Sequence, residues 1–317
     1  MRKQIPGFLF SIPLKPADQV TRLAGDASNR AFFRVGGRRN SVVVMVYPGP
    51  AALEIASVIR LSSVYRAAEI PVPAVIDQVD DRALFLEDLG DLSLQKAIRI
   101  SAGKERENLL IQAGLILQKI AAISPRETLS RLNRERALDE LLFFHEHLLG
   151  KTAKYSELGA LKESLNYLAC RIPGADTFAH RDFHSRNIMV KKGRLYLIDF
   201  QDSLVAPAVY DLVSLAFDSY LEPGEKRRLL AAPDFDWESP DLLYTALQRN
   251  LKALGTFAFQ AGQRGRKTYL RYIPRTIRHA LGHLEALADH YLHPLANHLQ
   301  ILKKNSIHAL FLKKTKD

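Results

Sequence analysis

Hydrophobic and polar residues follow two patterns in the first 90 residues. Residues 19–47 contain three alternating or apolar runs, separated by "AGDASN" and "GGRRN", and Gly36–Gly37 is a strong hairpin signal. This pattern predicts a three-stranded antiparallel meander. Apolar residues then recur at helical spacing over residues 51–70, and the proline-containing "PVPAV" ends that predicted helix. The run "ALFLED", residues 83–88, predicts one more short strand.

After about residue 92 the pattern changes to long amphipathic helices. Residues 103–123 and 134–150 each carry apolar residues at helical spacing, and helices resume from residue 206 after an interruption at 178–203. A strand-rich part followed by a helix-rich part predicts an α+β fold with a cleft at the connection. The predicted parts are an N-terminal β-rich lobe over residues 1–86, a hinge over 87–91 and a C-terminal helical lobe over 92–317.

Composition narrows the function classes. The chain has 317 residues, 47% of them hydrophobic, and contains no apolar run long enough to cross a membrane. Prolines and a glycine interrupt the basic N-terminal stretch "MRKQIPGFLFSIPL", so we expect neither a signal peptide nor a membrane partner. The single cysteine, Cys170, excludes an internal disulfide framework and favours the cytoplasm.

The net charge is strongly positive, but its distribution does not indicate nucleic acid. There are 45 Lys and Arg against 34 Asp and Glu, which gives a net charge of +11. These charges are scattered, and the chain lacks the interleaved aromatic and basic residues of a single-strand groove. We therefore expect no nucleic-acid partner, while the positive excess would attract anionic small molecules to a cleft.

The stretch "FAHRDFHSRNIMVKKGRLYLIDFQDS", residues 178–203, carries the clearest chemical signal. Asp182 and Asn187 stand at the spacing H-R-D-x-x-x-x-N, and Asp199 follows an apolar run with strand character. Phosphoryl transfer needs a carboxylate that orients the acceptor hydroxyl and oxygen ligands that hold magnesium. The pattern predicts Asp182 as the catalytic base, with Asn187 and Asp199 as magnesium ligands.

Each of these residues alone has a simpler explanation. An Asp–Asn pair in a loop is usually turn chemistry, and a lone Asp after a strand is usually a cap. His180 is expected to brace the loop by hydrogen bonds. Only the joint pattern, with Asn187 five residues after Asp182 and then a turn, a strand and Asp199, favours a kinase site.

Four patches of the sequence resemble one enzyme family. They are "LAGDASNRAFFRV", "FLEDLGD", "HRDFHSRNIMV…LIDFQDSLVAPAVYDL" and "QRNLKALGTFAFQAGQRGRKTYLRYIPR". Together they resemble the aminoglycoside phosphotransferase/choline kinase branch of the protein-kinase-like fold. Within that branch they are most similar to bacterial sugar kinases that phosphorylate the anomeric hydroxyl of N-acetylmuramate and N-acetylglucosamine.

The resemblance implies a two-lobed fold, a small antiparallel sheet lobe plus a larger helical lobe, that uses ATP and magnesium (Mg). It implies the roles given above for the "HRD" and "DFQD" residues, and it implies that Asp211 braces the catalytic loop from within. It also implies a phosphate-covering loop and a hinge whose backbone meets adenine. The nucleotide-binding residues implied in this way are Gly25, Ala27, Ser28, Asn29, Arg30, Glu87 and Leu89.

The chain departs from the protein-kinase pattern at several positions. "GDASNR" has a single glycine, and Met45 stands where the third strand of a protein kinase carries its phosphate-binding lysine. The sugar kinases resemble this chain in lacking that lysine. Arg30 or Arg34 could supply the charge, since strand alternation puts both on one face. Glu54 is then either unpaired or a surface residue.

"DFQD" replaces D-F-G, and no activation segment follows it. These two features indicate a permanently assembled site and a small-molecule acceptor, with no protein substrate.

The acceptor pocket is expected in the helical part. Candidates are Gln248, Arg249 and Asn250, which lie in a patch that carries the resemblance, and also Glu140 and His145. Residues 145–147 are expected to form a solvated helix segment. A basic chain favours a neutral or anionic sugar over a polycation, and an arginine would suit the lactyl carboxylate of N-acetylmuramate. Two alternatives stay open: a kinase of an aminoglycoside or a choline-like alcohol, and a nucleotide-binding pseudokinase.

Overall fold

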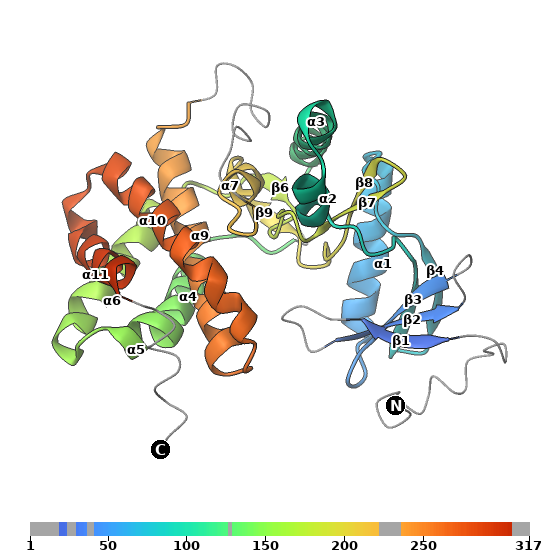
Figure 1. Ribbon diagram of the computed structural model, residues 1–317, viewed down its shortest axis with the longest axis horizontal. Helices are drawn as coiled ribbons and strands as arrows, with labels where there is room; N and C mark the ends of the chain where they lie inside the picture. The colour runs from blue at the N-terminus through green and yellow to red at the C-terminus, as the bar shows by residue number, and fades with distance from the viewer. Residues whose placement is uncertain (1–18, 24–29, 37–40, 126–128, 222–235, 306–317) are drawn as a thin grey trace. The chain divides into compact units, whose positions relative to one another are not determined.

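The computed structural model describes residues 19–23, 30–36, 41–125, 129–221 and 236–305 (Figure 1). The chain divides into two compact units. Unit 1 comprises residues 1–91 and 196–201, and unit 2 comprises residues 92–195 and 202–317. None of the helices within the described ranges is long and apolar enough to span a membrane.

Unit 1 contains one antiparallel sheet in the order β1-β2-β3-β5-β4. The predicted meander is confirmed, and so is the strand at residues 83–88. The fourth strand in the sequence was not predicted, because its residues, "VIDQV", are mostly exposed at the sheet edge and show no apolar alternation. The strands are β1 (Val20–Leu23), β2 (Ala31–Gly36), β3 (Ser41–Val46), β4 (Val75–Val79) and β5 (Ala83–Glu87).

The two faces of this sheet differ. Strand alternation sends Phe33, Val44 and Phe85 into one buried apolar cluster. The opposite face carries Phe32 and Met45, which are partners in the register of β2 and β3. The predicted helix follows the meander as α1 (Ala52–Ala67).

Residues 196–201 belong to unit 1 because they contact two other segments of that unit. The Leu197 amide donates to the Pro71 carbonyl at 2.8 Å, and the rings of Phe200 and Tyr65 lie 5.4 Å apart. Asp199 is therefore held by unit 1.

Unit 2 is built mainly of helices. The long helix α9 packs against α4, α7, α10 and η4, and apolar side chains such as Leu141, Phe144, Leu251 and Ile277 fill the core between them. Two short strand pairs, β6 with β9 and β7 with β8, carry the catalytic stretch, and the last two residues of β8 belong to unit 1. The helices are α2 (Leu94–Ile100), α3 (Gly103–Ala121), α4 (Arg134–Phe144), η3 (His145–Leu149), α5 (Gly150–Thr152), α6 (Tyr155–Arg171), α7 (Tyr210–Ala216), α9 (Pro240–Gly262), η4 (Lys267–Tyr272), α10 (Ile273–Leu287), η5 (His290–Leu292) and α11 (His293–Lys304). The short strands are β6 (Thr177–Ala179), β7 (Ile188–Lys191), β8 (Arg194–Leu197) and β9 (Leu204–Ala206).

A close helix crossing positions the functional end of α9. A Cβ atom added at Gly255 would lie 2.8 Å from Cα of Phe144, so only glycine lets α9 approach α4 this closely. This approach brings residues 248–252 of α9 to Glu140 on α4.

The predicted helix over residues 134–150 is not uniform. It is α-helical to Phe144 and continues as the π-helical turn η3. The wider turn changes the direction of the side chains beyond it. His147 is buried, with its ring 4.2 Å from that of Phe143 and 5.0 Å from that of Phe259. The expectation of a solvated segment is therefore wrong for His147.

Candidate active site

The backbone of the catalytic loop is fixed from below by Asp211. Its carboxylate accepts hydrogen bonds from the amide of His180 at 2.6 Å and from that of Arg181 at 3.0 Å. Arg181 adopts a left-handed conformation with φ of 78°, which a residue with a side chain rarely holds without such support. Asp211 itself is buried at the start of α7. The predicted brace beneath the loop is confirmed.

The loop brings Asp182 and Asn187 together. The Asn187 side-chain amide donates to the Asp182 carbonyl at 3.0 Å, and the Asn187 backbone amide donates to the His184 carbonyl at 2.9 Å. This leaves the side-chain oxygen of Asn187, Oδ1, without a hydrogen-bond donor among the described residues. That oxygen is available to a ligand.

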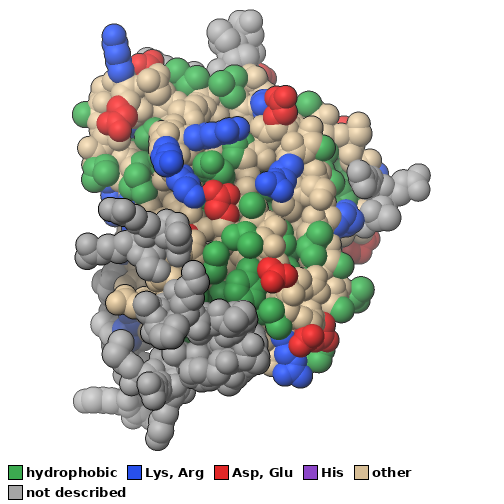
Figure 2. Space-filling model, turned by 90° about the vertical axis from the view of Figure 1, so that its right-hand side faces the viewer, with side chains coloured by type: hydrophobic (Ala, Val, Ile, Leu, Met, Phe, Trp, Pro, Cys, Tyr) green, Lys and Arg blue, Asp and Glu red, His purple; other side chains and the backbone are tan. Residues whose placement is uncertain are grey.

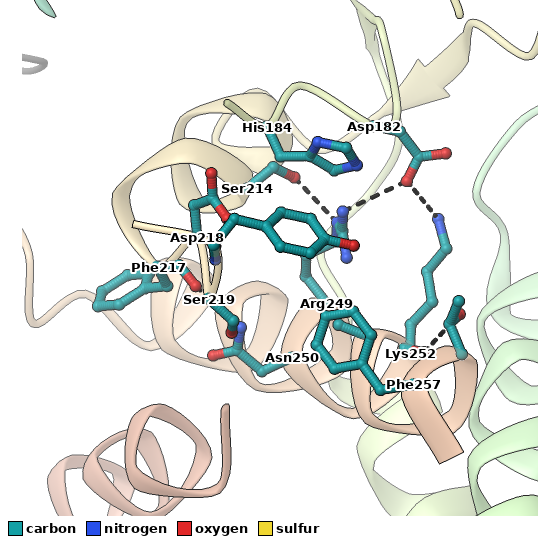
Figure 3. A pocket seen from close by; sticks show the side chains of 13 residues that line it. Asp182, His184, Ser214, Phe217, Asp218, Ser219, Arg249, Asn250, Lys252 and Phe257 are labelled. Atoms are coloured by element: carbon teal, nitrogen blue, oxygen red, sulfur yellow. Dashed lines mark hydrogen bonds and ion pairs between the residues drawn. The ribbon is translucent and has the colours of Figure 1, made fainter. Parts of the chain in front are cut away.

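The two carboxylate oxygens of Asp182 have different surroundings. Arg249 donates to Oδ1 at 3.3 Å and Lys252 donates to the same oxygen at 3.4 Å (Figure 3). Within the described ranges no donor reaches Oδ2, and the side chain is 30% exposed. Burial alone would raise the pKa of Asp182, but Lys252 and Arg249 outweigh it and hold the pKa well below its usual range. Asp182 is therefore ionised, with one oxygen free.

Glu140 anchors the same cluster from α4. Its carboxylate accepts from Arg181 at 2.9 Å and from Gln248 at 2.8 Å, and it lies 3.6 Å from the Lys252 ammonium. Burial would raise the pKa of Glu140, but Lys252 and Arg181 lower it. An internal carboxylate thus pairs with the arginine of the "HRD" stretch.

A pocket opens beside this cluster in unit 2 (Figure 3). Polar and charged groups line it together with the rings of Phe217, Tyr220 and Phe257. Arg249 lines the pocket, but Gln248 does not, because its side chain is fully buried and points to Glu140. The other lining residues are Asp182, His184, Ser214, Asp218, Ser219, Asn250, Lys252, Ala253 and Thr256.

Lys252 is a candidate site residue that the sequence analysis did not name. It lies within the patch "QRNLKALGTF", three residues after Arg249, and this spacing puts both side chains on one face of a helix. That spacing was the available signal.

In unit 1, Asp199 is exposed at 43% and accepts hydrogen bonds from Arg30 at 3.0 Å and from Gln201 at 2.9 Å. Arg34 is occupied elsewhere, with two bonds to Asp88 at 2.6 and 2.9 Å and two to Asp91 at 3.1 Å.

The predicted hinge residues also lie in unit 1. The Glu87 amide donates to the Ala74 carbonyl at 2.8 Å. Leu89 is buried, and within the described part of the chain its backbone N–H and C=O have no hydrogen-bond partner. The other nucleotide-binding residues predicted in the first loop, Gly25, Ala27, Ser28 and Asn29, lie outside the described residues.

Comparison with known proteins identifies the family. A family model described as "Phosphotransferase enzyme family" matches residues 19–243, which is more than half of the chain. The chain belongs to this phosphotransferase family. It is a small-molecule phosphotransferase, and the predicted family is confirmed.

Two relatives of this phosphotransferase are named N-acetylmuramate/N-acetylglucosamine kinase. The one from Neisseria meningitidis serogroup B is 27% identical over 281 residues, which is 82% of this chain and 84% of the relative. The one from Pseudomonas aeruginosa is 28% identical over 285 residues, 83% of each chain.

Solved structures confirm the predicted fold. The ADP-bound aminoglycoside phosphotransferase APH(2'')-Ib aligns with a TM-score of 0.61 at 15% identity, over 88% of this chain and 96% of its own. A thermostable mutant of aminoglycoside phosphotransferase APH(4)-Ia aligns with a TM-score of 0.60, over 83% and 94%. The phosphotransferase therefore has the protein-kinase-like α+β fold, with a small antiparallel sheet lobe and a larger helical part.

The donors present in the phosphotransferase suit magnesium better than a transition metal. Across the described ranges no three His, Cys, Asp or Glu residues gather as a metal site. Magnesium instead needs one or two carboxylate or amide oxygens and completes its shell with water and phosphate. The free Oδ1 of Asn187 and the exposed carboxylate of Asp199 are groups of this kind.

Proposed function

We propose that this phosphotransferase transfers the γ-phosphoryl group of ATP, with magnesium, to the anomeric hydroxyl of an amino sugar such as N-acetylmuramate or N-acetylglucosamine. The observation that carries the proposal is the asymmetry of Asp182. Its Oδ1 is held by Arg249 and Lys252, while its Oδ2 is free to meet a hydroxyl. The names of the two relatives support the choice of sugar.

Asp182 is the residue that orients the acceptor. Its Oδ2 accepts a hydrogen bond from the sugar hydroxyl. The sugar oxygen bonds to the γ-phosphorus while the bond to the bridging oxygen breaks, ADP leaves, and the hydroxyl proton passes to Asp182. Because its pKa is held low, Asp182 is a weak base. An anomeric hydroxyl suits such a base, since the ring oxygen makes it more acidic than an ordinary alcohol.

Asn187 and Asp199 are the proposed magnesium ligands, through Oδ1 of the amide and through the carboxylate. Bound magnesium would neutralise phosphate charge and orient the phosphoryl group. Unit 1 is proposed to bind the nucleotide, with the loop Gly25–Arg30 over the phosphates and Glu87–Leu89 at adenine. The unpartnered backbone groups of Leu89 support this assignment, as does the ADP bound in APH(2'')-Ib.

The pocket of unit 2 is proposed as the acceptor site. The largely buried rings of Tyr220 and Phe257 line the pocket, and they would give the apolar side of a sugar an apolar wall to contact. Arg249 and Lys252 would attract an anionic substituent such as a lactyl carboxylate and would disfavour a polycationic aminoglycoside. The Gln248 side chain donates to Glu140 and does not line the pocket. We therefore propose Lys252, and not Gln248, as an acceptor-binding residue beside Arg249.

Basic and acidic side chains are interspersed on the face shown in Figure 2. We therefore keep a small molecule as the proposed partner. A cytoplasmic location stays a prediction from the single cysteine.

The proposal is tested by ATP consumption with magnesium across an acceptor panel of N-acetylmuramate, N-acetylglucosamine, glucose, choline and kanamycin. We expect turnover only on the two acetylated amino sugars, and none by Asp182→Asn. Turnover confined to kanamycin or choline would replace the proposed acceptor. ATP binding without turnover on any acceptor would indicate a pseudokinase.

A further inference from the structure

The third strand of unit 1 carries no charge at the position where a protein kinase binds phosphate. Met45 lies in the middle of the sheet, between Phe32 of β2 and Leu84 of β5, and is only 3% exposed. Glu54, on α1, is exposed and has no ion-pair partner among the described residues. Met45 therefore replaces the lysine of the protein-kinase ion pair, and Glu54 forms no ion pair within the described residues.

The guanidinium of Arg30 lies next to Met45. Arg30 precedes β2 and lies on the same face as Phe32, so that its side chain crosses to Met45. Its Nη1 lies 3.9 Å from the sulfur of Met45, and its Nη2 lies 3.0 Å from Oδ1 of Asp199. The side chain is 15% exposed, whereas that of Asp199 is 43% exposed. The charge is thus held over Met45, beside a proposed magnesium ligand that solvent and ligands can reach.

The second candidate, Arg34, is unsuited to this task. Asp88 and Asp91 bind its guanidinium from two sides, and Ser41 also donates to Asp88 at 2.6 Å. These contacts hold Arg34 against the predicted hinge, residues 87–91. A phosphate could bind the Arg34 guanidinium only by displacing the carboxylates of Asp88 and Asp91.

We infer that Arg30 binds the nucleotide phosphates in place of the strand lysine that Met45 replaces. Guanidinium offers two parallel N–H donors that match two phosphate oxygens, and it stays charged at every physiological pH. Its contact with Asp199 holds it ready beside the metal-binding carboxylate. This inference rests on the proposed function as an ATP-dependent kinase and adds the residue that replaces the lysine.

The test compares nucleotide affinity by calorimetry in four proteins: wild type, Arg30→Ala, the control Arg22→Ala, and the double variant Arg30→Ala/Met45→Lys. Arg22 is an exposed arginine of the same sheet. Each is titrated with ATP in magnesium and again in a metal chelator, and thermal unfolding checks that each is folded. We expect Arg30→Ala to bind ATP about 10- to 100-fold more weakly in both buffers. Arg22→Ala should bind as wild type does, and the lysine at position 45 should recover part of the loss.

The two buffers separate a phosphate contact from an indirect effect. If Arg30 only held Asp199 in place for the metal, affinity would fall in magnesium and not in the chelator, and the inference would be overturned. Wild-type affinity of Arg30→Ala in both buffers would overturn it as well. Neither result would contradict the proposed function. The proposed function fails if the wild-type protein binds no ATP or phosphorylates no acceptor.

Discussion

The Lys252 ammonium lies 3.4 Å from Oδ1 of Asp182 and 3.6 Å from Oε1 of Glu140. A partly buried lysine between two carboxylates connects α9 to both the catalytic loop and α4. Burial lowers the pKa of Lys252, and the two carboxylates oppose that effect. The contact engages Oδ1 of Asp182 and leaves Oδ2 as the oxygen proposed to meet the acceptor hydroxyl.

Replacing Lys252 with methionine keeps the apolar stem and removes the charge. We expect kcat to fall about 100-fold, because Asp182 loses one of the two contacts that orient it. The KM for ATP should stay unchanged, and Lys252→Arg should restore part of kcat. Steady-state kinetics measure both constants. Lys162→Met, at an exposed lysine of α6, is the matched control. A wild-type kcat in Lys252→Met would show that the ion pair is only structural.

Asp182→Asn removes the proposed base and keeps its shape. We expect kcat to fall about 10²- to 10⁴-fold, since an amide cannot accept the hydroxyl proton. ATP affinity should remain close to that of the wild type. Initial rates on N-acetylmuramate and calorimetric titration with ATP measure the two effects. Asp139→Asn, at an exposed position of α4, should change neither. Substantial activity in Asp182→Asn would remove Asp182 from the mechanism.

Asp199→Ala should act on metal binding. We expect weaker ATP affinity in magnesium and nearly unchanged affinity in a chelator, because the lost carboxylate is a proposed ligand of the metal. Arg30→Ala is expected to lose affinity in both buffers, whereas Asp199→Ala should lose it only in magnesium, so one calorimetric series distinguishes the two roles. Asp77→Ala, on the exposed edge strand, controls for loss of an acidic group in unit 1. Equal loss in both buffers would contradict a metal-ligand role.

The pair of Arg34 and Asp88 predicts a pH dependence of stability. Burial would raise the pKa of Asp88, but hydrogen bonds from Arg34 and Ser41 and from the Gly90 amide lower it to about 2. A carboxyl whose pKa is depressed in the folded state stabilises the protein above its unfolded pKa, near 4, and loses that effect as pH falls toward 2. The contribution is below about 2 kcal/mol, because solvent near the carboxylate screens part of the interaction. Urea unfolding between pH 2.5 and 7 should therefore show a smaller loss of stability in acid for Asp88→Asn than for wild type. Identical pH profiles would contradict the assignment.

Local spacing explains why part of the site could be predicted from sequence. Asp182 and Asn187 lie on one short loop, so their relation is fixed over five residues and is visible in the chain. The ion pair of Lys252 with Asp182 joins residues 70 positions apart, and that of Glu140 with Arg181 joins residues 41 apart. Such pairs depend on how helices pack, and no local pattern encodes them.

The same distinction applies to the fold. Alternation predicted the meander and put Arg30 and Arg34 on one face of the sheet. The choice between them required Asp88 and Asp91, which arrive from another part of the chain. Helical spacing predicted a helix over residues 134–150, but it could not show the π-helical turn, which begins directly after Phe144, where α9 lies close to α4.

That packing gives the last prediction. A Cβ at Gly255 would meet the backbone of Phe144 at 2.8 Å, whereas one at Gly282, in α10, would meet nothing within 4 Å. We expect Gly255→Ala to destabilise the protein by about 1–3 kcal/mol through overpacking. Gly282→Ala should stabilise it by up to about 1 kcal/mol through better helix propensity. Chemical denaturation measures both. Because Gly255 sets the distance at which Lys252 meets Glu140, kcat should fall in Gly255→Ala and stay unchanged in Gly282→Ala. Equal effects of the two substitutions on stability would show that α9 and α4 can separate freely, and Lys252 would then be held by Asp182 alone.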